Sequence, residues 1–249
     1  MGIILEGAIS VLAVLESDPS RIGAVLIRRG LTSPAAEKVR RFAEIRGVTV
    51  RFADDGEIGE LTAGRSHGGI IAAAEKRGYN TAEEIVSQAR DAVALIEGIE
   101  DPYNLGYAAR AAYTQGIGAL LLPRRDFGDS EAAVERASTG TFSRIPAALF
   151  SSGPGEKAAL ISTFKAGGYS VYCIDNKKGA KSIFEVRFKD KALIIVGGEK
   201  RGISREFAAA ADESAAIPYA RPFPHSLAAQ TALSIAAFEL HRQRREGRP

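Results

Sequence analysis

The 249-residue sequence contains no tryptophan, a single cysteine and only three histidines. One cysteine excludes an intrachain disulfide framework and any zinc site built on cysteines. The histidines His67, His225 and His241 lack the spacing of a metal site. We therefore expect neither a disulfide-stabilised secreted domain nor a metalloprotein.

Long apolar runs are also missing, because no stretch approaches the ~18 uninterrupted apolar residues that a membrane-spanning helix needs. The apolar N-terminal segment MGIILEGAISVLAVLES has no basic start and contains Glu6 and Glu16. It predicts a strand followed by a helix rather than a signal peptide. We expect no membrane attachment and a cytoplasmic location.

Charge is nearly balanced, since 33 lysines and arginines stand against 30 acidic residues and give a net charge of +3. Such a small excess favours a nucleic-acid partner only slightly. With 45% hydrophobic and 25% charged residues, the composition is that of an ordinary globular protein. The lone Cys173 lies in the apolar run YSVYCI, which predicts a buried strand residue.

The first part of the chain alternates apolar strands with helical patterns. The pattern predicts helices at 6–17, 33–46 and 55–63, and strands at 22–28, 48–53 and 68–75. Ser33 followed by Pro34 is a strong helix-start signal. Residues 1–76 therefore form a small α/β domain in this prediction, and the polar, then helical segment 77–90 is the linker to a second domain, 91–249.

The second domain also alternates, and its strands are almost wholly apolar. Predicted strands lie in AVALIEG and at 118–123, 147–150, 169–174 and 191–196, with a short extended piece at 217–220. Predicted helices lie at 104–116, 130–137, 155–167 and 226–246. Apolar strands separated by helices predict an α/β fold with a mostly parallel sheet that is covered on both faces.

Three stretches carry candidate chemistry. In DPYNLGYAAR (101–110), Asn104 stands at the start of a helix and Arg110 follows six positions later. Both side chains would reach the carboxyl end of the sheet, where open α/β folds bind ligands. A helix-capping asparagine and a solvated arginine remain the alternative.

The stretch VGGEKRGIS (196–204) follows an apolar strand. Gly197, Gly198 and Gly202 let the backbone approach a flat ligand, and Glu199 lies between them. The pattern is neither the GxGxxG turn of a dinucleotide-binding fold nor a P-loop. An ordinary strand-to-helix turn stays open as an interpretation.

In the third stretch, AIPYARPFPHSLAAQTALSIAAFEL (216–240), Ser226 is predicted to cap the final helix. His225 brings a titratable ring to the same edge, although a loop or cap contact is the favoured interpretation. Each stretch alone is a weak signal, but their order along the chain is informative.

Taken together, the three stretches resemble the signature motifs of the SpoU/TrmH family, the ribose 2′-O-methyltransferases of the SPOUT class. The segment ASTGTFSRIP (137–146) is similar to the family's small-residue segment between the first two motifs. The resemblance covers about residues 91–246. The first 76 residues are similar in layout to the ribosomal-protein-like substrate domain of longer members.

The resemblance implies a catalytic domain with a deep trefoil knot, a homodimer, and S-adenosylmethionine as methyl donor without a metal. It assigns donor contacts to Gly197, Ile217 and Leu227, and Gly198 and Gly202 in the same glycine turn as Gly197 are expected to take part. Thr139 and Gly140 are expected nearby.

For catalysis, the resemblance gives Arg110 the central role. Because an arginine is a poor base, we expect it to bind the adjacent phosphate and stabilise a developing alkoxide, with proton acceptance left open. Asn104 would orient Arg110 or the ribose, Glu199 would fix the knot loops, and Ser226 belongs to the third motif.

One position departs from the family, because Ala228 stands where the third motif usually has asparagine. His225 or Gln230 could supply the missing group. Otherwise the chain is a slow enzyme or a catalytically silent RNA-binding protein on the same fold.

The N-terminal domain favours ribosomal RNA over transfer RNA as the substrate, because compact transfer-RNA enzymes of this family lack it. A conventional Rossmann-type enzyme is a further alternative. It requires a phosphate-binding turn after an early strand, and residues 1–30 contain none.

Overall fold

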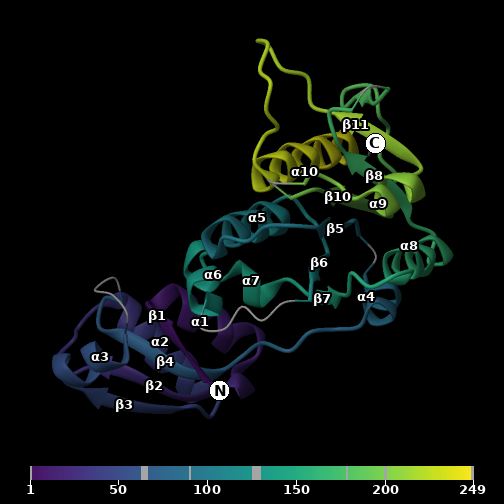
Figure 1. Cartoon of the computed structure of the whole chain (residues 1–249). Coiled ribbons are helices and arrows are strands. Elements are labelled where there is room, and N and C mark those ends of the chain that lie inside the picture. The colour runs from purple at the N-terminus through teal and green to yellow at the C-terminus, as the bar shows by residue number, and fades with distance from the viewer. Residues whose placement is uncertain are drawn as a thin grey trace. The chain divides into compact units, whose positions relative to one another are not determined.

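The computed structural model describes residues 2–62, 67–89, 91–124, 130–177, 179–198 and 201–247. Within these ranges, none of the helices combines the length and the apolar character required to cross a bilayer. The chain forms two compact units. One contains the residues up to 78 and the described part of 127–144, and the other contains 79–126 and 145–249 (Figure 1).

The first unit is built on a four-stranded sheet in the order β1-β4-β2-β3, in which only β2 and β3 run parallel. Its strands are β1 (Gly2–Glu6), β2 (Ile22–Arg28), β3 (Thr49–Ala53) and β4 (Ile70–Glu75). Its helices are α1 (Ala8–Ser17), α2 (Pro34–Ile45), α3 (Asp55–Leu61), α6 (Glu131–Ala137), α7 (Thr141–Arg144) and the 3₁₀ helix η1 (Pro19–Arg21). The predicted small α/β fold is confirmed.

Local sequence explains the elements of this sheet and its helices. The Ser33 hydroxyl accepts a hydrogen bond from the Ala36 N–H at 3.1 Å, and Pro34 opens α2, as the start signal predicts. Side chains of β2 and of helices α1 and α2, among them Val25, Ile27 and Val39, form one buried apolar cluster. Burial of this cluster drives the packing of the helices on the sheet.

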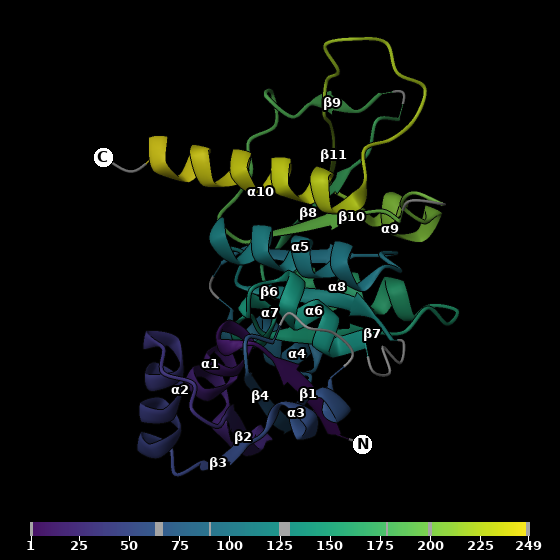
Figure 2. The same ribbon diagram turned by 90° about the vertical axis from the view of Figure 1, so that its left-hand side faces the viewer.

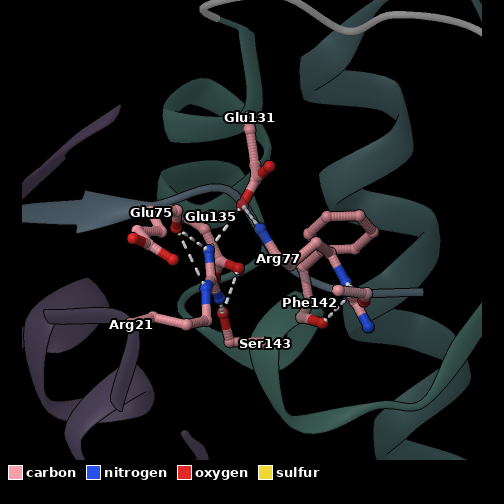
Figure 3. Close-up of polar contacts among 8 residues, drawn as sticks. Arg21, Glu75, Arg77, Glu131, Glu135, Phe142 and Ser143 are labelled. Carbon is pink, nitrogen blue, oxygen red and sulfur yellow. Dashed lines mark hydrogen bonds and ion pairs between the residues drawn. The ribbon is translucent and has the colours of Figure 1, made fainter. Parts of the chain in front are cut away.

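Helices α6 and α7 join this unit through a buried polar network (Figure 3). Arg21 forms an ion pair with Glu131 at 2.7 Å, and both side chains are less than a tenth exposed. The Arg21 guanidinium also donates to the Glu75 carbonyl and to the Ser143 hydroxyl, and Ser143 in turn donates to Glu135. The sequence places 130–144 in the C-terminal domain, whereas this long-range charge pairing packs it with the N-terminal elements.

The second unit holds a seven-stranded sheet in the order β7-β6-β5-β10-β8-β11-β9, and every neighbouring pair is parallel. Its strands are β5 (Val93–Ile96), β6 (Ala119–Pro123), β7 (Ala147–Phe150), β8 (Ser170–Ile174), β9 (Lys181–Ser182), β10 (Ala192–Val196) and β11 (Glu213–Ala216). Its helices are α4 (Ala82–Gln88), α5 (Pro102–Thr114), α8 (Glu156–Ala166), α9 (Arg205–Ala210) and α10 (Ala229–Glu246). The prediction of a mostly parallel sheet is confirmed.

Helices cover both faces of this sheet (Figures 1 and 2). Alternate strand residues such as Leu95, Leu121 and Ile195 form a core with Phe164 of α8 and Phe207 of α9. Helices α5 and α10 pack against each other, and α10 contacts β8 and β10. The apolar character of every central strand follows from this double burial.

Several boundaries differ from the sequence prediction. The short extended piece predicted at 217–220 is wrong, because the strand in this region is β11 (Glu213–Ala216) and it ends before Ile217. Helix α5 begins earlier, because the Asp101 carboxylate caps it by accepting from the Asn104 N–H at 2.8 Å. Helix α10 begins at Ala229, and its N-cap residue is Ala228, which makes no side-chain capping hydrogen bond. The prediction that Ser226 caps this helix is therefore wrong. The threading of the C-terminal segment into a knot stays a prediction.

Candidate active site

A cavity of about 200 Å³ lies at the carboxyl ends of β8, β10 and β11. Its walls come from residues 174–176, from 196–198 with 202–203, from Ile217 and Tyr219, and from Ser226 and Leu227. Ala229 and Ala232 of α10 close it. Loops at this edge of a parallel sheet are the usual ligand-binding position of open α/β folds.

The turn after β10 leaves no room for a side chain at Gly197 or Gly198. Gly198 and Gly202 exchange two backbone hydrogen bonds, of 3.2 and 2.9 Å. A Cβ atom at Gly197 would lie 2.2 Å from the Gly202 carbonyl carbon, and Gly202 itself has φ +62°. These glycines are therefore required by backbone contact and by left-handed geometry.

Side-chain hydrogen bonds fix the other two loops. The Asn176 Oδ1 atom accepts from the Ile217 N–H at 3.0 Å, which ties the end of β8 to the segment after β11. The Tyr219 Oη atom accepts from the Leu227 N–H at 3.1 Å. Sequence reasoning missed Asp175, Asn176 and Tyr219. The available signal was the polar pair Asp175-Asn176 directly after a buried strand, at the edge where ligands bind.

A nearly buried ion pair supports the glycine turn from outside the cavity. Glu97, directly after β5, binds Lys157 of α8 at 2.7 Å, and both side chains are only about a tenth exposed. The second Glu97 oxygen accepts from the Ser204 N–H at 2.8 Å. Glu97 therefore holds the end of the segment that lines the cavity, a role that the sequence alone did not suggest.

The structure brings most of the predicted donor-binding residues together. Gly197, Gly198 and Gly202 line the cavity with Ile217 and Leu227.

Thr139 and Gly140 belong to the first unit, where they form the left-handed turn that ends α6. The Gly140 N–H donates to the Glu135 carbonyl at 2.9 Å, as at a helix C-terminus. A Cβ at Gly140 would lie 2.3 Å from the Ala13 Cβ of α1. Packing against α1 therefore accounts for the small residue here, and a place for Thr139 and Gly140 near the donor stays a prediction.

The predicted catalytic residues are divided between two places. Ser226 lines the cavity. Asn104 lies on α5, and its Oδ1 atom accepts a hydrogen bond from the Gln230 Nε2 atom at 3.1 Å. Gln230 follows Ala229 in the first turn of α10, and its Oε1 atom is buried with no hydrogen-bond partner in the described ranges. Through this hydrogen bond, Asn104 contacts the first turn of α10, which closes the cavity.

Arg110 is exposed on α5 and does not line the cavity. Its guanidinium has no hydrogen-bond or ion-pair partner in the part of the chain that the structure describes, so it is available to an external anion. Glu199 lies outside the described residues. His225 is exposed and contacts the Phe223 ring, not Asn104.

The cavity suits a ligand with both apolar and polar parts. Ile174, Val196 and Ile203 give apolar walls, whereas Asp175 and Asn176 add polar groups. The nearby Cys173 is buried, and burial raises the pKa of its thiol to about 12. A thiol that stays protonated at neutral pH does not act as a nucleophile. The site is therefore built to hold and orient a ligand.

Comparisons with known proteins agree with this geometry. The model of the SpoU rRNA methylase family matches residues 91–238, and a second model, RNA 2′-O ribose methyltransferase substrate binding, matches residues 4–80. The 23S rRNA (guanosine-2′-O-)-methyltransferase RlmB of Xanthomonas campestris is 26% identical over 245 residues, which cover 96% of each chain.

Solved structures share the fold across nearly the whole chain. The SpoU methyltransferase AviRb from Streptomyces viridochromogenes, crystallised with its cofactor AdoMet, has a TM-score of 0.79 at 21% identity, covering 98% of this chain and 91% of that one. An rRNA methyltransferase from Sinorhizobium meliloti has a TM-score of 0.78 at 24% identity, with 97% and 87% covered. The resemblance seen in the sequence motifs is confirmed: this chain belongs to the SpoU rRNA methylase family.

Proposed function

We propose that the chain transfers a methyl group from S-adenosylmethionine to a ribose 2′-hydroxyl of ribosomal RNA. The observation that carries this proposal is the convergence of the second and third predicted motifs, 196–204 and 216–240, on one cavity, with the first motif, 101–110, joined to it through the Asn104–Gln230 hydrogen bond. The similarity to RlmB over the full length supports an RNA ribose as acceptor.

The chemistry of the cavity fits the donor. The Gly197 backbone packs directly against Gly202, and the cavity walls combine aliphatic side chains with Asp175 and Asn176. We assign donor binding to Gly197, Gly198, Gly202, Ile217 and Leu227. When bound, S-adenosylmethionine supplies a methyl group on a sulfonium leaving group, so the protein has to position the acceptor rather than provide a nucleophile.

Arg110 would act on the acceptor. A guanidinium keeps its positive charge at neutral pH. It can bind a phosphate through two parallel hydrogen bonds and stabilise charge that develops on the 2′-oxygen. Its exposure and its lack of a partner in the described ranges leave it open to such a phosphate. Ser226 and Glu199 complete the proposed catalytic set.

Gln230 would supply the carboxamide that Ala228 lacks. The Gln230 amide donates to Asn104, whereas the ring contact of His225 is with Phe223. With Gln230 in this place, loss of the usual asparagine does not by itself require a silent RNA-binding protein.

We further propose a homodimer that uses α5 and α10, and a knotted C-terminal segment. Tyr103 and Tyr107 of α5 and Phe238 of α10 are each more than two-fifths exposed, which is unusual for large apolar side chains on two packed helices. Exposed apolar patches of this kind mark association surfaces. Light scattering of the full chain distinguishes a dimer from a monomer.

The experiment that tests the function is transfer of labelled methyl from S-adenosylmethionine to unmodified ribosomal RNA transcribed in vitro, with transfer RNA transcripts in parallel. Digestion to nucleosides should yield a labelled 2′-O-methylnucleoside from ribosomal RNA. Label from transfer RNA alone would favour the transfer-RNA enzyme, and donor binding without transfer would favour the silent RNA-binding protein.

A further inference from the structure

The loop between β11 and α10 carries a row of three aromatic rings. Figures 1 and 2 both show this segment as an extended loop that projects from the second unit. The Phe223 ring lies 6.4 Å from the Tyr219 ring and 5.4 Å from the His225 ring. Phe223 is 58% exposed, so the row presents an aromatic surface to solvent.

The loop that carries the row is restrained. Pro218, Pro222 and Pro224 fix three backbone φ angles within it. The Tyr219 hydroxyl bridges the loop, because it accepts from the Leu227 N–H at 3.1 Å and donates to the His225 carbonyl at 3.4 Å. Rings held in place lose little conformational entropy when a ligand stacks on them.

The row is also next to the proposed donor cavity. Tyr219 belongs both to the row and to the cavity wall, and Leu227, which its hydroxyl binds, lines the same cavity. Segment 217–228 contains Arg221 and no acidic residue. An exposed arginine beside aromatic rings, without a carboxylate in the loop, fits a polyanion that carries flat groups.

We propose that Tyr219, Phe223 and His225 form a stacking platform for an unpaired base of the RNA substrate. This inference rests on the proposed function and extends it, since it names the residues that recognise the nucleotide region next to the methylated ribose. Single-stranded RNA is recognised by stacking of unstacked bases on such side chains. The two rival occupants are the adenine of the donor and a second copy of the chain.

The test uses the full chain and the variants Phe223→Ala and Phe223→Trp. Phe184→Ala is the matched control, because Phe184, at 69%, is at least as exposed as Phe223 and lies in the same unit but outside the row. The measurements are KM and kcat with unmodified ribosomal RNA, the donor Kd by calorimetry, the mass by light scattering, and the Kd for a fluorescent single-stranded RNA decamer without donor.

Loss of one stacking ring typically weakens RNA binding by roughly 5- to 150-fold. We expect Phe223→Ala to raise the KM and the decamer Kd in this range, with the donor Kd and the mass unchanged. Phe223→Trp should retain both values, and Phe184→Ala should behave like the wild type. The proposal would be contradicted if RNA binding were unchanged in Phe223→Ala or fell equally in Phe184→Ala. A weaker donor Kd or a changed mass in Phe223→Ala would also contradict it.

Failure of the proposed function gives a different result. If the wild type transfers no methyl group to any RNA, the methyltransferase proposal fails. The decamer measurement then still decides whether Phe223 stacks on a base, because it needs neither donor nor turnover.

Discussion

Substitution Gly197→Ala tests the backbone geometry on which the donor cavity depends. The added Cβ would lie 2.2 Å from the Gly202 carbonyl carbon, 2.5 Å from the Ile203 nitrogen and 2.6 Å from the Gly202 oxygen. Ordinary contacts between such atoms are about 3.5 Å. All three neighbours are backbone atoms, so the turn has to move by roughly 1 Å to accept the methyl group.

Overpacking of this kind costs about 1–3 kcal/mol. Because the displaced backbone at 202–203 lines the cavity, we expect the strain to appear in donor binding, as a Kd for S-adenosylmethionine that is roughly 5- to 150-fold weaker. Titration calorimetry measures this Kd directly, and circular dichroism checks that the variant is folded.

Gly59→Ala is the matched control. Gly59 lies in α3, has no heavy atom within 4 Å of an added Cβ, and does not need a left-handed conformation. Alanine should therefore leave donor binding unchanged and stabilise the helix by about 0.5–1 kcal/mol. A Gly197→Ala variant that binds the donor as tightly as the wild type would refute the close approach of Gly197 to Gly202.

Three further predictions concern buried ionisable groups of the fold. Glu97→Gln removes the nearly buried ion pair with Lys157, and we expect urea unfolding to show a loss of about 3 kcal/mol; an unchanged midpoint would contradict this role. Burial raises the pKa of the Glu135 carboxyl above its unfolded value of about 4.3, although the hydrogen bond from Ser143 lowers it. The stability that Glu135 contributes is therefore complete below pH ~4.3 and is lost as the pH rises through the folded pKa. Glu135→Gln should therefore gain stability over the wild type as the pH rises above ~4.3, and parallel urea-unfolding profiles for the two proteins would disagree. Because burial raises the pKa of the Cys173 thiol to about 12, iodoacetamide at pH ~8 should label the protein only after denaturation, as read by mass spectrometry.

Much of the second unit could be predicted from sequence, because its strands are buried on both faces and are therefore continuous apolar runs. Val93–Ile96 and Ala192–Val196 are wholly buried strands of this kind. The resemblance to the SpoU/TrmH motifs predicted the convergence of the glycine turn with Ile217 and Leu227, and the geometry agrees with it, since the carboxyl ends of parallel strands meet at one edge.

Other features depend on contacts that no local pattern contains. Ser226 has the residue type of a helix cap, yet α10 begins after it, because Tyr219 binds the Leu227 N–H and the segment is drawn into the cavity wall. The place of α6 depends on the pairing of Arg21 with Glu131, which are 110 positions apart.

This pairing affects how the N-terminal domain should be studied. Deletion of residues 1–76 would remove Arg21, which forms the ion pair with Glu131 and lies near Glu135. A buried carboxylate without its partner is strongly destabilising. Loss of activity after such a deletion would therefore report misfolding as well as RNA recognition, and point substitutions on the surface of this domain are the better experiment.

The central claim is that Arg110 serves transfer to a ribose oxygen while the cavity binds the donor. The most direct measurement compares the wild type, Arg110→Ala and Arg110→Lys for labelled methyl transfer to unmodified ribosomal RNA, with nucleoside analysis of the product and donor Kd by calorimetry. We predict a labelled 2′-O-methylnucleoside with the wild type, none with Arg110→Ala and a reduced amount with Arg110→Lys, at donor Kd values within a few-fold of one another. A label on the base, or a normal rate with Arg110→Ala, would contradict the account.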